Sequence, residues 1–375
     1  MSKLLSYYLV FSKYAERLIN IIDTFLRKNI LMMSYKNDMI KNNKKLKKVR
    51  NLSKSQKNEI QSYYKGLIGR KVSLYSHEYF YSRTGIFSKR YVPTDLYYSE
   101  LIAKANKANV QVVYCDKNVL DVFLPKDKVP HVYLKNMNGY FYFDGNPVTQ
   151  TEAIKRCSNI GTVILKPSLS SKGKGIRKLV LKEGVDTETN QNIEHIFKKY
   201  KSDYTIEECI IQHERMAALN PTSVNTIRIL TYRSDYEVLV VYAVIRIGRL
   251  GSLVDNQSAG GISVSIDKEG KLNKYAIAGA TTDGVEKTDT GVVLDGYQIP
   301  SFFEAIELVK QFHTHFPYSK ILGWDMAIKE NGNPILLEVN TKPGLSQSAL
   351  GSGFGEYTDK IINELWSRPN TKFKL

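Results

Sequence analysis

Cysteine is scarce in this sequence, with three residues among 375. Cys115, Cys157 and Cys209 form an odd, scattered set that supports neither a disulfide framework nor a zinc site. Cys115 and Cys209 lie in apolar runs, so we expect them to pack in the core. This usage predicts a protein of the reducing cytoplasm.

Long apolar runs are also missing. No stretch reaches the roughly 18 uninterrupted apolar residues that span a bilayer. Residues 4–11 are apolar, but charged residues interrupt the sequence that follows, and no small-residue cleavage site is evident. We therefore expect neither a transmembrane segment nor a signal peptide.

Acidic residues are too few to balance the basic ones. The chain has 37 Asp and Glu against 54 Lys and Arg, which gives a formal net charge of +17 and a pI near 9.4. Such an excess favours a polyanionic partner: nucleic acid, an anionic membrane, or a phosphorylated or acidic substrate.

Much of the basic excess lies near the N-terminus. Residues 1–34 carry apolar side chains at helical spacing, and a lysine-dense stretch runs from Lys36 to Lys54. Together they could lie on an anionic membrane surface. The alternative is a packed helix followed by a solvated basic helix or linker.

Residues 321–340 form the most informative stretch. Two apolar runs flank a polar break at residues 330–334 that has the composition of a hairpin turn. Glu338 and Asn340 lie two apart and share a strand face, and antiparallel pairing would bring Asp325 to the same face. Oxygen ligands of this kind suit Mg²⁺, so we predict a metal site. The alternative is a surface hairpin with solvated polar positions.

A second informative stretch is rich in hydroxyls, glycines and lysines. Its members are Ser170, Ser171, Lys172, Gly173, Lys174 and Gly175. Glycines let backbone N–H groups approach a phosphate, and lysines neutralise its charge. Strands are expected on both sides, so this is not a Walker A loop, which precedes a helix. It is either a phosphate-covering flap or a flexible hairpin loop.

The order of these features gives the sequence a family resemblance. Lys166 precedes the flap, Glu207 and Glu208 follow it, and Asp325, Glu338 and Asn340 come far downstream. This order resembles the ATP-grasp superfamily, above all its sugar-transfer-associated group, which is related to the ribosomal-protein glutamate ligases. The likeness covers roughly residues 70–355. Its most specific pieces are Lys166-Pro167, residues 171–175, residues 225–228, Asp255-Asn256 with Gly260-Gly261, and residues 338–344.

The resemblance implies an α+β ATP-grasp fold, in which two lobes grip ATP. Four segments are then expected: an N-terminal helical segment (1–62), an α/β domain (63–150), a small lobe with flap and hinge (151–211) and a large lobe with the metal site (212–375). Within the second segment, residues 97–106 predict a helix and residues 111–115 a buried strand. Residues 187–200 are helical in character.

The resemblance also implies roles for nucleotide-binding residues. Lys166 would contact the α-phosphate and the adenine edge, and the flap would close over the β- and γ-phosphates with Lys172 or Lys174 nearest the γ-phosphate. Glu207 and Glu208 would take the adenine amino group at the hinge, with Ile210 beside the base. Gln212 or His213 is a candidate for the ribose, although the hinge lacks the family's usual glycine–glutamate pair.

Catalysis would depend on charge and position. Asp325, Glu338 and Asn340 would hold two Mg²⁺ ions, or Mn²⁺, between the phosphates, and Arg228 would stabilise the transferring phosphoryl group. Asn256, like Arg246, resembles a substrate-facing residue. The alternatives are a structural ion pair for Arg228 and a turn residue for Asn256. His313 and His315 lie two apart on a predicted helix, so they face different ways and are not expected to be ligands.

The function implied is a carboxylate–amine ligase that works through an acyl phosphate, with sugar-borne carboxylate or amine substrates in capsule or surface-polysaccharide assembly. One alternative is an ATP-grasp kinase, which shares the nucleotide chemistry. Another is a basic nucleic-acid- or membrane-binding protein on an ATP-grasp body. Nucleic acid is the less favoured partner because each matched nucleotide and metal position keeps a competent residue.

Overall fold

The computed structural model describes residues 2–46, 48–170, 173–279 and 284–367. It divides the chain into two compact units. Unit 1 combines Met1–Lys104 with Thr358–Leu375, and unit 2 is Ala105–Tyr357. The two termini of the chain therefore belong to the same unit.

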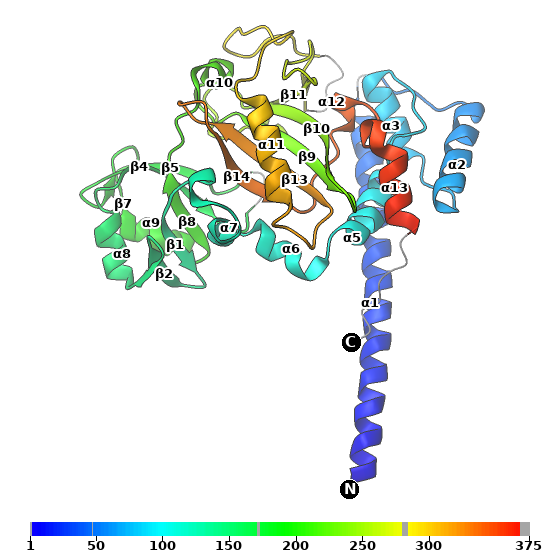
Figure 1. Cartoon of the computed structure of the whole chain (residues 1–375), viewed down its shortest axis with the longest axis horizontal. Helices are drawn as coiled ribbons and strands as arrows, with labels where there is room; N and C mark the ends of the chain where they lie inside the picture. Colours follow the sequence, from blue (N-terminus) through cyan, green and yellow to red (C-terminus); the bar gives the residue numbers. More distant parts are fainter. Residues whose placement is uncertain (1, 47, 171–172, 280–283, 368–375) are drawn as a thin grey trace. The chain divides into compact units, whose positions relative to one another are not determined.

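Unit 1 is helical. Its elements are α1 (Ser2–Lys44), α2 (Lys54–Ile68), α3 (Tyr75–Thr84), α4 (Thr94–Leu96), the π-helical turn η1 (Tyr97–Leu101), α5 (Ile102–Ala105), at whose last residue unit 2 begins, and α13 (Thr358–Ser367) (Figure 1). Ser53 starts α2 with a capping box, and Gly69 ends it in the left-handed region. The boundary expected at residue 62 falls inside α2. None of the described helices is both long and apolar enough to cross a membrane.

Unit 2 begins with short helices and then builds an eight-stranded antiparallel sheet in the order β3-β2-β1-β8-β4-β5-β6-β7. Its strands are β1 (Val132–Met137), β2 (Tyr140–Phe143), β3 (Asn146–Val148), β4 (Gly161–Pro167), β5 (Arg177–Lys182), β6 (Val185–Asp186), β7 (Gln191–Asn192) and β8 (Tyr204–Glu208). Helices α8 (Gln150–Cys157) and α9 (Ile193–Tyr200) contribute Ala153, Ile196 and Phe197 to the core of this sheet.

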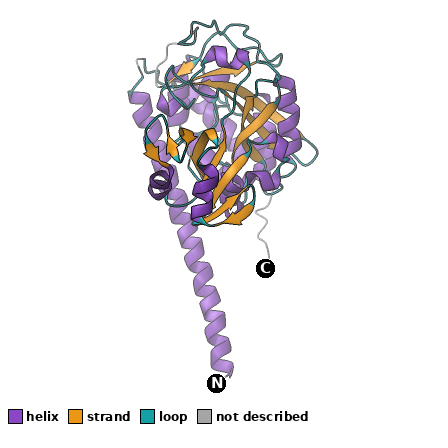
Figure 2. Ribbon diagram, turned by 90° about the vertical axis from the view of Figure 1, so that its left-hand side faces the viewer, coloured by secondary structure: helices purple, strands orange, loops and turns teal. Residues whose placement is uncertain are grey.

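A second antiparallel sheet of six strands follows in the order β12-β11-β10-β9-β13-β14. Its strands are β9 (Thr226–Arg233), β10 (Val238–Ile247), β11 (Ile262–Ile266), β12 (Ile277–Ala278), β13 (Ile321–Ile328) and β14 (Pro334–Asn340), and its helices are α10 (Glu214–Leu219), α11 (Phe302–His313) and α12 (Gln347–Leu350). The buried positions Phe302, Ala305, Val309 and Phe312 line one face of α11, and this face packs on the sheet. Figure 2 shows the strands of both sheets in orange.

The predicted strand at residues 111–115 was wrong, because this stretch is helix α6 (Ala108–Cys115). Its β-branched residues favour a strand locally, but Gln111 and Tyr114 are buried while Val112 and Val113 are exposed. Burial at a spacing of three is a helical pattern. The ring of Tyr114 packs edge-on against Phe316, so tertiary packing overrides the local preference.

Two further expectations differ from the structure. The boundary expected at residue 150 divides one sheet, because β1 pairs with β8 over Val132–Glu207 to Asn136–Tyr204. The helix expected from residue 187 starts only at Ile193, where the Asn192 side chain caps it by accepting from the Glu194 N–H. Residues 187–190 instead form a turn between the short strands β6 and β7.

His313 lies in a buried hydrogen-bond chain beneath the second sheet. Trp324 Nε1 donates to Thr231 Oγ1 at 2.7 Å, Thr231 Oγ1 lies 2.7 Å from His313 Nδ1, and His313 Nε2 lies 3.0 Å from the Ser319 carbonyl oxygen. A neutral imidazole protonated at Nε2 satisfies both contacts. Burial lowers the pKa of His313 to about 4.

This burial predicts acid sensitivity that His313→Gln should reduce. The unfolded histidine protonates near its ordinary pKa of 6.5 and the folded one only near 4. Above pH 6.5 the side chain is neutral in both states and does not reduce the unfolding free energy. As the pH falls toward 4, protonation stabilises the unfolded state and the unfolding free energy declines. Between pH 7 and pH 5, wild type should lose about 2 kcal/mol more unfolding free energy than the variant, measured by urea denaturation. The exposed His315 provides the control: His315→Gln should keep the wild-type pH dependence.

Candidate functional site

The residues singled out by sequence meet at a cavity of about 140 Å³ within unit 2, here called the cleft. Both sheets contribute to its lining. Of the predicted residues, eight line it: Lys166, Gly173, Glu208, Ile210, Arg246, Asn256, Asp325 and Glu338. Lys117 and Asp255 line it as well.

Lys166 is held in place by Glu207. The strand β4 pairs with β8 so that Lys166 lies opposite Thr205, and the Lys166 Nζ donates to Glu207 Oε2 at 2.7 Å. The Thr205 hydroxyl donates to the other oxygen of Glu207 at 2.5 Å. The Glu207 carboxylate therefore orients a lysine that lines the cleft, and of the two hinge glutamates Glu208 is the one that lines it.

The hinge follows β8 directly. Glu208 faces Lys329, whose Nζ lies 3.4 Å from both carboxylate oxygens, and Cys209 and Ile210 continue the lining. Gln212 is engaged elsewhere: its Nε2 donates to the Asn220 and Ser223 carbonyls, at 3.0 and 2.9 Å. Its amide supports the loop before β9 and does not line the cleft.

The flap lies between β4 and β5. Ser171 and Lys172 lie outside the described residues, while the Ser170 hydroxyl donates to the Pro167 carbonyl and Lys174 is exposed. Gly173 has a φ of +70°, and a Cβ there would lie 2.6 Å from Val254. At Gly175 a Cβ would lie 2.9 Å from Pro167, also with positive φ. Only glycine fits both positions without rearrangement.

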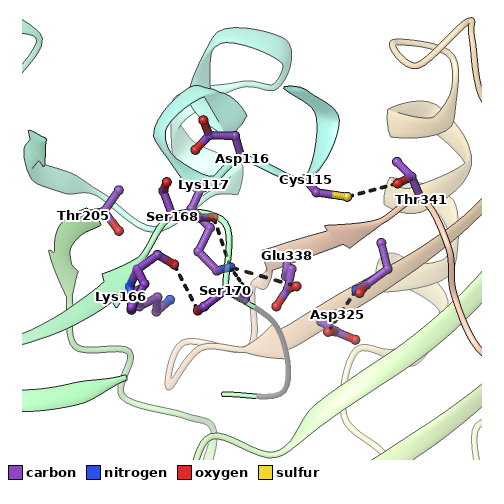
Figure 3. A network of polar contacts seen from close by, with 12 residues as sticks. Cys115, Asp116, Lys117, Lys166, Ser168, Ser170, Thr205, Asp325, Glu338 and Thr341 are labelled. Carbon is purple, nitrogen blue, oxygen red and sulfur yellow. Dashed lines mark hydrogen bonds and ion pairs between the residues drawn. The ribbon is translucent and has the colours of Figure 1, made fainter. Parts of the chain in front are cut away.

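Lys117 is a cleft residue that sequence reasoning missed. It follows helix α6 in the turn η2 (Lys117–Val119), its side chain is 6% exposed, and its Nζ lies 3.1 Å from the Ser170 carbonyl oxygen and 4.0 Å from Glu338 Oε1 (Figure 3). The Asp116 side chain caps this turn by accepting from the Asn118 N–H. A buried ammonium among carbonyls and a carboxylate is suited to an anionic ligand. The dipeptide Asp116-Lys117 after an apolar run was the available signal.

The predicted hairpin is confirmed as β13 and β14, with Asp325 directly opposite Glu338. Gly332 makes the turn with a φ of +83°. Figure 3 shows Asp325 and Glu338 close together. Asn340 Nδ2 lies 3.4 Å from Asp325 Oδ2, so the three predicted metal-binding side chains are neighbours. Among the described residues no group of three or more His, Cys, Asp and Glu side chains gathers, so any metal here relies on two carboxylates and an amide.

Asp325 is surrounded by positive charge. It forms a two-point ion pair with Arg228, through Nε to Oδ1 and Nη2 to Oδ2 at 2.8 Å, and a second pair from Arg246 Nη2 to Oδ2 at 2.9 Å. Burial alone would raise the pKa of Asp325, but the two guanidinium groups outweigh it and lower the pKa to about 2. The structural ion pair considered for Arg228 is therefore present.

Arg246 connects this pair to Asp255. Its Nε lies 3.0 Å from Thr226 Oγ1 and 3.5 Å from Asp255 Oδ2. Burial raises the pKa of Asp255, Arg246 opposes the shift, and the nearby Asp325 carboxylate adds to it. Burial likewise raises the pKa of Glu338, against Lys117 and together with Asp325. The cleft thus concentrates opposite charges that water screens poorly.

Asn256 lies at the edge of the cleft and starts the turn η4 (Gln257–Ala259). Its carbonyl oxygen accepts from the N–H groups of Ala259 and Gly261 at 3.0 and 3.1 Å. A Cβ at residue 261 would lie 2.4 Å from the Asp255 carbonyl oxygen, so this glycine lets the loop close tightly. Asn256 is both a turn residue and a cleft residue.

Comparison with known protein families shows to which family the chain belongs. The family model of sugar-transfer associated ATP-grasp matches residues 97–361. The chain belongs to this family. Its α+β fold is the ATP-grasp fold, as the resemblance implied, and the matched range spans the whole cleft.

Solved ATP-grasp structures resemble this family member at low identity. The biotin carboxylase domain of 2-oxoglutarate carboxylase from Hydrogenobacter thermophilus is 16% identical, with a TM-score of 0.43 over 71% of this chain and 48% of that chain. A Campylobacter jejuni biotin carboxylase is 13% identical, with 0.42 over 70% and 47%. The Vibrio cholerae D-alanyl-alanine synthetase A is 14% identical, with 0.41 over 67% and 65%. The chain spans about half the length of the two carboxylase structures. No curated protein sequence matches it significantly.

Proposed function

We propose that this ATP-grasp protein is an ATP-dependent carboxylate–amine ligase. The observation that carries the proposal is the cleft, where Lys117, Lys166 and Arg246 face Asp325 and Glu338 around one cavity. Cations for phosphates and oxygen donors for a metal are what phosphoryl transfer requires. Membership of the sugar-transfer associated ATP-grasp family supports the same conclusion.

The nucleotide would lie along the first sheet. Lys117 and Lys166 would neutralise its phosphates, and the Glu208–Ile210 segment would line the adenine. The flap backbone would cover the phosphates, with Lys172 or Lys174 near the γ-phosphate. Asp325, Glu338 and Asn340 supply oxygen donors that fit Mg²⁺, and a bound Mg²⁺ would shield the charge of the transferring phosphoryl group.

Two displacements would make the amide. An oxygen of the substrate carboxylate attacks the γ-phosphorus and the bond to the β-phosphate oxygen breaks, which gives an acyl phosphate and ADP. The amine nitrogen then attacks the acyl carbon, phosphate leaves with the electron pair of the C–O bond, and the nitrogen releases a proton. Arg228 and Arg246 would keep positive charge beside both steps.

The charges of the cleft favour a ligase over a kinase. A hydroxyl acceptor is helped by a general base, whereas a carboxylate nucleophile is already ionised. Each carboxylate lining the described part of the cleft has a basic residue within ion-pair distance: Glu208 has Lys329, Asp255 has Arg246, Asp325 has Arg228 and Glu338 has Lys117. None is placed as an unpaired base.

The family's link to sugar transfer suggests the substrate class. We place the carboxylate or the amine on a sugar, as in capsule or surface-polysaccharide assembly. The part of the cleft lined by Arg246, Asp255 and Asn256 would face this substrate. Arg246 would then bind its carboxylate.

The proposal predicts ADP release only when a carboxylate and an amine are both present. The purified chain would be incubated with Mg-ATP and a panel of uronic acids, amino sugars and amino acids, and products would be identified by mass. Condensation with loss of water is the expected product. A gain of one phosphoryl group on a hydroxyl acceptor, with no amine present, would establish the kinase instead.

A further inference from the structure

Helix α1 carries an exposed apolar stripe that the cleft does not explain. Leu18, Ile22 and Phe25 are 59%, 50% and 65% exposed. The N-terminal helix is continuous (Figure 2). Together with Asn29, Met32 and Lys36, these residues follow one another at spacings of four and three, so the six lie along one face of it. Exposed apolar side chains aligned in this way indicate a contact surface.

The stripe ends at a cavity within unit 1. This cavity has a volume of about 290 Å³, and Asn29, Met32 and Lys36 of α1 line one side of it. The loop after α2 lines the other side with Arg70 and Lys71. Apolar and cationic groups therefore meet where the stripe ends.

The charge of this cavity suits a phosphate. Among the described residues no carboxylate forms an ion pair with Lys36 or Lys71, and both lysines are exposed at the rim. Lys36 Nζ lies 5.0 Å from the ring centroid of Tyr75, and Arg70 pairs with Glu100. The cavity's own carboxylate, Asp95, is 6% exposed and accepts from the Ser73 hydroxyl at 2.9 Å.

We propose that α1 lies on an anionic membrane surface and that this cavity binds the phosphate of a lipid headgroup. The stripe from Leu18 to Met32 extends about 21 Å along the helix, which is longer than the hydrocarbon of one leaflet is thick, about 15 Å. The stripe therefore fits a helix that lies along the membrane surface better than one that enters a leaflet end-on. Amphipathic helices lie at this boundary with the apolar side toward the acyl chains and basic residues among the headgroups. The site is separate from the proposed ATP chemistry.

Charge argues against a second copy of the chain on the same stripe. Residues 28–54 contain nine Lys and Arg against one acidic residue, Asp38. Parallel pairing of two α1 helices would bring these basic segments together, and it would place Asn29 and Lys36 in the apolar contact. An anionic lipid surface gains from the same charges that oppose self-association.

The test uses the full chain and sedimentation with phosphatidylcholine vesicles, with and without phosphatidic acid. Binding is expected only to the anionic vesicles. Replacing both Lys36→Gln and Lys71→Gln should weaken it about 30-fold, as two interfacial lysines predict. The matched control pair, Lys57→Gln with Lys65→Gln on α2, removes the same charge from exposed positions in unit 1 and should bind nearly as wild type does.

A second variant tests the stripe. Phe25→Gln should weaken vesicle binding at least about tenfold, and Ile86→Gln, at another exposed apolar position of unit 1, should not. Equal losses in the lysine pair and its control would overturn the cavity assignment. Binding of inorganic phosphate as tight as that of vesicles, unaffected by Phe25→Gln, would assign a free-phosphate site instead. A dimer abolished by Ile22→Gln, without vesicle binding, would assign the stripe to a second copy.

Discussion

Replacing Glu338 with glutamine should reduce ADP release by about a thousandfold while the protein stays folded. Glu338 lines the cleft opposite Asp325, with Lys117 Nζ 4.0 Å from its carboxylate. Glutamine keeps the size of the side chain but removes the charge that would hold Mg²⁺. The rate of ADP release with saturating substrates measures the effect, and the thermal shift produced by Mg-ATP should decrease with it.

Glu330→Gln is the matched control for this prediction. Glu330 lies exposed in the turn of the same hairpin, so its loss should leave the rate unchanged. Burial raises the pKa of Glu338, and a metal ligand must be deprotonated, so wild-type activity should begin to decline on acidification above the ordinary glutamate pKa of 4.5. Wild-type rates in Glu338→Gln would remove this residue from the proposed mechanism.

The hairpin could be predicted from sequence because its causes are local. Alternation fixes the shared face of Glu338 and Asn340, and the Gly332 turn joins the two strands. A one-residue register shift between Asp325 and Met326, which no local pattern indicated, places Asp325 opposite Glu338. The glycines of the flap are equally local, since a positive φ at Gly173 and Gly175 is a property of the chain itself. The hairpin and the glycine positions of the flap could therefore be predicted without knowledge of the tertiary structure.

Lys117 could not be found in the same way. Its importance comes from the Ser168 and Ser170 carbonyls, more than 50 residues later in the chain, and from Glu338. The stretch before it favoured a strand by composition, whereas packing of Tyr114 makes it a helix. Because the element before Lys117 was predicted wrongly, nothing in the local sequence indicated that this lysine lines the cleft.

Charge pairing over long separations was also beyond local reasoning. The sequence left Arg228 open between a catalytic cation and a structural ion pair, and only the register of β9 against β13 places it beside Asp325. The same sheet brings Arg246 Nη2 within 2.9 Å of Oδ2 of that carboxylate. Gln212, a candidate for the ribose, instead supports the loop at Asn220 and Ser223, a contact no pattern indicated.

These buried charges predict that Asp325→Asn costs about 3–5 kcal/mol of unfolding free energy at pH 7. Asp325 is 3% exposed, and its carboxylate neutralises both Arg228 and Arg246. Asparagine has a similar size, but without Asp325 the one carboxylate among the described residues within ion-pair distance of these two guanidinium groups is Asp255, beside Arg246. Urea denaturation of the two proteins, with the unfolding followed by circular dichroism, measures the difference.

Two comparisons separate this effect from a simple loss of packing. Because the pKa of Asp325 is lowered from 3.8 to about 2, the ion pairs stabilise the fold fully above about pH 4, and the advantage of wild type over Asp325→Asn should shrink as the pH falls toward 2. Adding Arg228→Gln to Asp325→Asn should cost less than the two single losses together, because it removes one uncompensated charge. A loss below about 1 kcal/mol, or strict additivity, would contradict the coupled ion pairs and leave Asp325 to the metal site alone.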